Sequence, residues 1–188
     1  DMPRFVGHIR TEAARLVTLI EDIIRLSQLD EGGELPFEPV DLQKLAEEAS
    51  ASLASAAAEK QVTIRVHRDD RQITTVRRLA SEIIYNLCDN AVKYNREGGS
   101  VDVTIDGTAH GAVVTVQDTG IGIPPEHQSR VFERFYRVDK SHSRQSGGTG
   151  LGLSIVKHAV QYLGGRIELE SQPGKGTTMR VHFPDGNA

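Results

Sequence analysis

Apolar residues recur at three- and four-residue steps near the start of the chain, which predicts a long amphipathic helix over residues 3–30. The apolar positions of this stripe are Phe5, Ile9, Leu16, Ile20, Ile23 and Ile24. Pro3 suits the first turn of a helix, and Gly32 and Gly33 are expected to end it. The stripe is long for a lone helix, so we expect it to pack against a partner helix.

Four further stretches have helical patterns: 42–60, 79–94, 124–135 and 151–163. Asp41 is a candidate N-cap for the first of them, because its carboxylate can accept hydrogen bonds from the free N–H groups of the first turn. Gly164 and Gly165 are expected to end the last one.

Alternating apolar residues predict six β-strands between and after these helices. The expected strands are 62–66, 73–76, 101–105, 114–116, 166–171 and 177–183. Turn residues 107–111 and Pro173-Gly174 separate the last two pairs, so each pair is expected to form a hairpin. Together the elements predict an α/β domain in which helices cover one face of a mixed sheet.

Residues 34–40 contain Pro36 and Pro39 and are expected to form an extended linker. We therefore place the domain boundary there, with a helical arm over residues 1–33 and the α/β domain over residues 41–188.

The composition of the chain argues against several classes of protein and of site. The 188 residues have a net charge of −4 and no long basic run, which argues against a nucleic-acid-binding protein. A single cysteine, Cys88, excludes a disulfide within the chain and a cysteine-rich metal site, and it favours a reducing compartment. No apolar run approaches the length of a membrane span, and no signal peptide opens the chain. Because the sequence begins inside a helix, we expect it to be part of a longer protein.

The first group of candidate functional residues lies on the helix over 79–94. Glu82, Asn86 and Asn90 are four residues apart and share one face. Neutral amide oxygens can bind a hard cation such as Mg²⁺ while bound phosphates supply the charge. Lys93 could contact a phosphate, and Tyr94 could stack on a base. A solvated helix face is the alternative, although asparagine is a poor residue for the middle of a helix.

The second group directly follows the strand over 114–116. Asp118 could accept a hydrogen bond from the exocyclic amino group of adenine. Gly120 and Gly122 allow a ligand to approach the backbone closely, and Ile123 ends the motif. The alternative is an ordinary Asp-Gly turn.

The third group opens the helix over 151–163. Its members are Gly148, Thr149, Gly150, Leu151 and Gly152. Free N–H groups at a helix N-terminus bind phosphate. The alternative is a flexible hinge, and the two interpretations are compatible with each other. Residues 174–177 only superficially resemble a P-loop, because a glycine separates Lys175 from Thr177 and no helix follows.

Four motifs in order carry a resemblance to a known family. Residues 86–94 resemble the N-box of sensor histidine kinases, and residues 118–123 are similar to their first glycine box. Residues 132–137 resemble their F-box, and residues 148–153 their second glycine box. The likeness covers about residues 41–183. It implies a Bergerat-type ATP-binding fold, a two-layer α/β sandwich shared with type II topoisomerases, heat-shock chaperone ATPases and mismatch-repair ATPases.

The resemblance implies a role for each residue at the phosphates of ATP. Asn86 would ligate Mg²⁺, with Asn90 beside it at the phosphates. Lys93 would contact phosphate, and Arg137 would lie near the γ-phosphate. Residues 138–147 would form the lid over the nucleotide.

The resemblance also implies the adenine site. Tyr94 would flank the base, Asp118 would bind its amino group, and Gly120 and Gly122 would admit it. The family often has Thr or Ser where this chain has Asn95, and we expect no functional change from that difference.

Residues 12–16 and 19–27 resemble the second helix of the family's dimerisation hairpin. The phosphoacceptor histidine of the family lies on the first hairpin helix, and none of His8, His142 and His158 has its sequence context. The acceptor is therefore expected outside this chain, on a helix of the same or the partner subunit.

The resemblance implies the catalytic part of a two-component sensor histidine kinase. It would transfer the γ-phosphoryl group of ATP to that histidine, for relay to a response regulator, within a homodimeric full-length protein. The chain would be the cytoplasmic portion of a membrane-bound sensor and unable to phosphorylate itself alone. One alternative is an ATPase of the same superfamily, with Glu82 activating water. The other is a nucleotide-binding module that only docks partners.

Overall fold

The computed structural model describes residues 2–30, 35–67, 72–138 and 149–186. The helices are α1 (Met2–Asp30), α2 (Leu42–Glu59), α3 (Arg77–Lys93), α4 (Pro125–Gln128) and α5 (Gly152–Tyr162). The strands are β1 (Glu38–Asp41), β2 (Thr63–Val66), β3 (Gln72–Thr75), β4 (Ser100–Thr108), β5 (Gly111–Asp118), β6 (Arg166–Gln172) and β7 (Gly176–Pro184).

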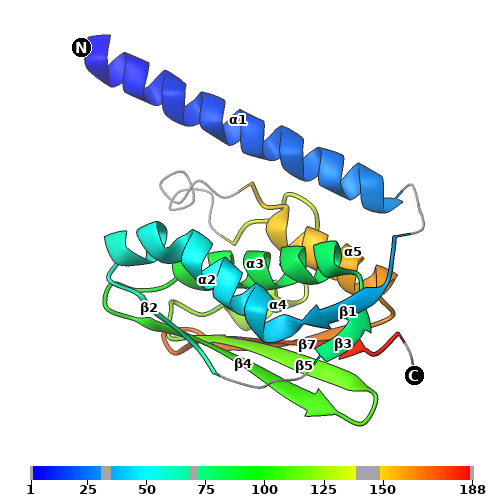
Figure 1. Cartoon of the computed structure of the whole chain (residues 1–188). Coiled ribbons are helices and arrows are strands. Elements are labelled where there is room, and N and C mark those ends of the chain that lie inside the picture. The colour runs from blue at the N-terminus through cyan, green and yellow to red at the C-terminus, as the bar shows by residue number, and fades with distance from the viewer. Residues whose placement is uncertain (1, 31–34, 68–71, 139–148, 187–188) are drawn as a thin grey trace.

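Five strands form one mixed sheet in the order β2-β4-β5-β7-β6. Strands β2 and β4 run parallel, and the other neighbours are antiparallel. Helices α2, α3 and α5 cover one face of this sheet, and α1 precedes the domain as a separate arm (Figure 1). The predicted α/β architecture, with helices on one face and a helical arm, is confirmed.

The core lies between the sheet and the helices, because alternate residues of each strand face α2, α3 and α5. On β4, Val101 and Val103 are fully buried, whereas the intervening Asp102 lies on the opposite, polar face. Ile83 and Ile84 of α3 are fully buried in the same cluster. This core fixes the position of α3, which carries the predicted N-box.

The predicted helix ends are confirmed at both α2 and α5. Asp41 accepts a hydrogen bond from the backbone N–H of Lys44 at 3.1 Å, as an N-cap does. Gly164 follows α5 with a φ of +70°, and the N–H of Gly165 donates to the carbonyl of Val160 at 2.9 Å.

Two segments differ from the sequence predictions. Residues 38–40, expected as linker, form β1 together with Asp41 and pair antiparallel with β3. The helix predicted over 124–135 is wrong beyond Gln128. The chain continues there in turns whose hydrogen bonds join residues three apart, such as Glu133 N–H to the Arg130 carbonyl at 2.9 Å. Phe135 then takes a φ of 64°, which no helical residue adopts.

The arm lies across the helix layer on the side away from the sheet (Figure 1). Leu19 packs against Leu151 and Ile155, and Asp22 is buried. The outward apolar residues of α1 are about half exposed: Val6, Ile9, Leu16, Val17, Ile20, Ile23 and Ile24. The partner helix expected for them stays a prediction. Gly32 and Gly33 lie outside the described residues, among which no helix is long and apolar enough to span a membrane.

The two faces of the sheet should respond differently to the same deletion. Val103→Ala removes two buried methyl groups and leaves a cavity, so it should lower the free energy of unfolding by about 2–3 kcal/mol. Val113→Ala, on the polar face of β5, should cost less than about 1 kcal/mol. Urea unfolding followed by circular dichroism measures both, and equal losses would contradict this assignment of the core.

Candidate functional site

A cavity of about 1350 Å³ opens between α3, the turn after β5, the residues before α5 and the arm. Most of the predicted site residues line it: Glu82, Asn86, Asn90, Lys93, Tyr94, Asp118, Gly122, Ile123, Arg137, Thr149, Gly150 and Gly152. Gly120 and Leu151 are buried behind its wall. Gly148 and residues 139–147 of the predicted lid lie outside the described residues.

Asn86 presents its amide oxygen to Gly152, the first residue of α5. Its side-chain nitrogen donates to the Glu82 carbonyl at 2.8 Å, which fixes the orientation of the amide. A Cβ added at Gly152 would lie 2.9 Å from Asn86 Oδ1 and 4.0 Å from Asn90 Nδ2. The space in front of both amides therefore exists because residue 152 has no side chain.

Two ammonium groups lie at the C-terminal end of α3. Lys93 Nζ forms an ion pair with Asp89 Oδ2 at 2.6 Å. Lys60 donates to the carbonyls of Val92 and Lys93, where the helix dipole favours a cation. Burial, with a smaller effect from Lys93, lowers the pKa of Lys60. Sequence reasoning missed Lys60, because it follows α2 and is brought to the cavity only by folding.

Asp118 is held by two backbone donors from different segments. Its Oδ1 accepts from Gly120 N–H at 2.8 Å and from Thr177 N–H at 3.2 Å. Burial raises the pKa of the Asp118 carboxyl, and the two N–H groups offset this only in part. Both bonds end on Oδ1, so a ligand donor would use Oδ2.

The glycines of the turn after β5 allow backbones to meet. A Cβ at Gly120 would lie 2.4 Å from the Tyr94 carbonyl oxygen, and one at Gly122, whose φ is +70°, would lie 2.1 Å from that of Gln172. Ile121 N–H donates to the Tyr94 carbonyl at 3.0 Å across this contact. Gly120 thus serves first to bring the turn against the end of α3.

Two described residues on either side of positions 139–148 are hydrogen-bonded to each other. Phe135 N–H donates to the Gly150 carbonyl at 3.0 Å, and Gly150 has a φ of +77°. A Cβ at Gly150 would contact the Phe135 backbone at 3.0 Å, so a side chain is disfavoured there. Arg137 consequently lies on the cavity wall beside Gly150.

The arm contributes residues to the same cavity, which no local sequence signal indicated. Thr18, Glu21 and Asp22 line it. Thr149 Oγ1 donates to Asp22 Oδ2 at 2.7 Å and accepts from Leu151 N–H at 3.3 Å. The hydroxyl predicted for ligand binding is therefore shared with α1.

The remaining candidates have structural partners. His158 contacts the Ser154 carbonyl through Nδ1 at 2.8 Å and Arg134 through Nε2 at 3.2 Å. Cys88 is fully buried, and burial raises the pKa of its thiol to about 12, which confirms the packing interpretation. Residues 174–177 lie at the β6–β7 hairpin, which confirms that they are no P-loop. His8 is in α1, and His142 lies outside the described residues.

Comparison with known proteins gives the family. Residues 75–187 match the model of the histidine kinase-, DNA gyrase B- and HSP90-like ATPases. This chain belongs to that family. The match begins at the end of β3 and includes α3, both glycine turns and β7, so it contains most of the cavity wall.

Relatives of this ATPase-family chain are sensor kinases. It is 38% identical over 191 residues to the sensor-like histidine kinase SenX3 of Mycolicibacterium smegmatis, covering 97% of this chain and 48% of the relative. It is 36% identical to the phosphate regulon sensor protein PhoR of Pseudomonas aeruginosa, covering 96% and 41%. The chain thus spans about half the length of the relatives that it matches.

Solved structures have the same architecture. ShkA, solved at full length in complex with AMPPNP, superimposes with a TM-score of 0.82 and 27% identity, over 97% of this chain and 38% of that one. The Acinetobacter baumannii histidine kinase AdeS has a TM-score of 0.80 over 100% of this chain and 86% of its own, and its 21% identity supports the fold alone.

The raised pKa of Asp118 predicts how binding at the cavity of this ATPase-family chain depends on pH. If Asp118 accepts a hydrogen bond from the amino group of adenosine, which has no phosphate to titrate, then adenosine should bind more weakly as pH falls through that pKa, because the bond would lose its charged acceptor. The stability of the folded chain should depend on pH in the opposite direction. A carboxyl whose folded pKa is raised favours the folded state below its unfolded pKa, and that contribution disappears as pH rises through the folded pKa.

Titration calorimetry at several pH values measures the adenosine affinity. In the Asp118→Asn control, binding should be weaker and nearly independent of pH. An affinity that is unchanged by pH in the unmodified chain would contradict the role of this carboxylate.

Proposed function

We propose that this chain is the ATP-binding catalytic part of a sensor histidine kinase, which transfers the γ-phosphoryl group of ATP to a histidine outside the chain. One observation supports this most strongly. A half-buried carboxylate at the end of a strand, Asp118, lines the same cavity as the amide and ammonium groups of Asn86 and Lys93. The end of the cavity at Asp118 suits an adenine amino group, and the end at Asn86 and Lys93 suits a metal-bound triphosphate.

Asn86 fits a magnesium ligand. Its amide oxygen faces the glycine turn, where the missing Cβ of Gly152 leaves room, and a neutral oxygen is a ligand that Mg²⁺ accepts when phosphates complete its shell. When bound, Mg²⁺ would neutralise charge on the phosphates. Asn90 and Thr149 would orient the phosphate chain, and the N–H groups at the start of α5 would bind its oxygens.

Lys93 and Arg137 would stabilise the charge that develops as the phosphoryl group leaves. Lys93 carries its charge beside Asp89, which holds the side chain at the cavity wall. Arg137 follows the F-box and lines the cavity next to Gly150. Catalysis would consist of positioning and charge stabilisation, since the acceptor imidazole is itself the nucleophile.

The adenine would lie at the opposite end. Asp118 would accept from its amino group, and Tyr94 and Ile123 would flank the ring. Gly122 allows the turn that forms this wall to lie against the backbone of Gln172. An adenine purine offers the amino donor that this carboxylate requires, whereas a carbonyl at the same ring position would face a negative charge.

The arm would join the catalytic domain to the acceptor helix. The half-exposed apolar stripe of α1 would pack on the first helix of a hairpin and on a second subunit, giving a homodimer of the full-length protein. The phosphorylated histidine would then pass its phosphoryl group to a response regulator. In this proposal the chain is the cytoplasmic portion of a membrane-bound sensor.

An ATPase is the second candidate, because Glu82 lines the cavity one helical turn before Asn86. Its carboxylate lies 3.7 Å from Arg78, an arrangement that holds the side chain along α3. Water activation by Glu82 and phosphoryl transfer to histidine predict different products, so they can be separated directly.

The labelling experiment uses ATP with a labelled γ-phosphate. The chain alone should acquire no label on histidine, whereas adding a separately produced hairpin with the acceptor helix should yield acid-labile, alkali-stable label on that hairpin. Asn86→Ala should reduce the transfer by at least about 100-fold, because it removes the proposed metal ligand. Acid-labile label on the chain alone would contradict the proposal.

The same samples test the alternatives. Rapid hydrolysis by the chain alone that disappears in Glu82→Gln would favour the ATPase. Unaltered partner binding in an Asn86→Ala chain that no longer binds Mg-ATP would favour the docking module.

A further inference from the structure

Arg96 is an exposed residue shortly after the end of α3 at Lys93, and its guanidinium donates to three backbone carbonyls. Nε donates to the Thr119 carbonyl at 2.6 Å, and Nη2 donates to those of Gly120 at 3.2 Å and Gly174 at 2.6 Å. Thr119 and Gly120 belong to the turn after β5, whereas Gly174 is at the β6–β7 turn. One side chain therefore ties two separate turns together.

Both turns border the adenine end of the cavity. Ile121 N–H donates to the Tyr94 carbonyl at 3.0 Å, and Gly174 N–H donates to the Ile121 carbonyl at 2.8 Å. With the bonds of Arg96, these contacts form a closed circuit that links the end of α3 to the turn after β5 and to the hairpin turn. Tyr94 and Ile121 from this circuit line the cavity, as does Pro173, the neighbour of Gly174.

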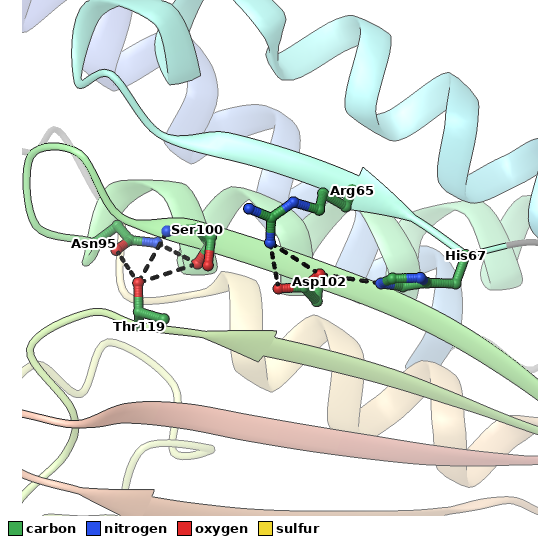
Figure 2. A network of polar contacts seen from close by, with 6 residues as sticks. All are labelled: Arg65, His67, Asn95, Ser100, Asp102 and Thr119. Carbon is green, nitrogen blue, oxygen red and sulfur yellow. Dashed lines mark hydrogen bonds and ion pairs between the residues drawn. The ribbon is translucent and has the colours of Figure 1, made fainter.

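Neighbouring polar contacts hold the start of this circuit. Figure 2 shows Asn95 with Ser100 and Thr119, where Asn95 Nδ2 donates to the Ser100 carbonyl at 3.0 Å. The Ser100 N–H donates to Thr119 Oγ1 at 2.9 Å. Asn95 Oδ1 also accepts from the Arg96 N–H at 3.0 Å, which directs Arg96 toward the turns.

We propose that Arg96 is a positioning residue that sets the geometry of the adenine wall, an inference that rests on the proposed ATP-binding function. Arg96 does not itself line the cavity. It acts on the base through the carbonyls that it holds, because charge-assisted hydrogen bonds from one guanidinium to three backbone carbonyls fix the two turns that carry them. The planar, forked guanidinium can bridge two turns at once, which a lysine ammonium does less well.

Arg65 supplies a matched control. It is an exposed arginine that pairs with the side chain of Asp102 at 3.3 Å, on the sheet face that the helices leave open (Figure 2). Arg65→Ala removes the same charge and side chain without touching either turn.

The experiment measures dissociation constants of adenosine, ATP and inorganic triphosphate for the unmodified chain and for Arg96→Ala, Arg96→Lys and Arg65→Ala. Arg96→Ala should weaken adenosine and ATP by about tenfold, since hydrogen bonds from a charged group order the wall. The adenosine and ATP affinities of Arg96→Lys should lie between those of Arg96→Ala and those of the unmodified chain. Triphosphate affinity should change no more than in Arg65→Ala, and neutral adenosine separates the effect on the wall from general charge loss.

Thermal unfolding of the same variants tests the alternative that Arg96 only stabilises the fold. A role confined to stability would lower the melting temperature while adenosine affinity stayed constant in the folded protein, and this would overturn the inference. If Arg96→Ala does not fold, Arg96→Lys provides the test. An adenosine affinity of Arg96→Lys equal to that of the unmodified chain would also overturn the inference. An unmodified chain that binds ATP, alongside an Arg96→Ala chain that binds it equally well, would refute only the role of Arg96. Absence of ATP binding by the unmodified chain would refute the proposed function itself.

Discussion

The site depends on one constraint: three backbone segments meet at distances that leave no room for side chains. A Cβ at Gly120 would collide with Tyr94, one at Gly122 with Gln172, and one at Gly176 would lie 1.9 Å from the carbonyl oxygen of Asp118. Only glycine permits these contacts without displacing the neighbouring backbone. Asp118 is held at their junction by the N–H groups of Gly120, in the turn after β5, and Thr177, in β7. A carboxylate that is costly to bury therefore has a fixed position and direction.

The opposite end of the cavity is assembled from elements that the core holds rigidly and from one that it does not. Helix α3 is fixed by buried residues such as Ile83, and it presents Asn86 and Lys93 to the cavity at one helical face. The arm contacts the same region through Asp22 and Thr149. Movement of α1 would therefore displace the turn before α5, because Asp22 is bonded to Thr149 there. This contact is a physical link between the arm and the proposed phosphate site.

Local patterns predicted most of the fold because the core is built from regular periodicities. The helices over 42–60 and 79–94 and both hairpins were predictable from spacing, caps and turn residues. The exceptions needed tertiary information. Strand β1 exists because β3 pairs with it. The helix after Pro124 ends at Gln128, and Phe135 further along hydrogen-bonds to Gly150, a contact far away in the sequence.

The same division holds in the site. Motif order placed most of the cavity residues, whereas Lys60, Asp22 and Arg96 act through partners more than 20 residues away in the chain, which no short pattern encodes. The most direct test is a crystal structure of the chain with Mg²⁺ and a non-hydrolysable ATP analogue. The account predicts the adenine amino group within hydrogen-bonding distance of Asp118 and the metal on the amide oxygen of Asn86. A base bound away from Asp118 would contradict it.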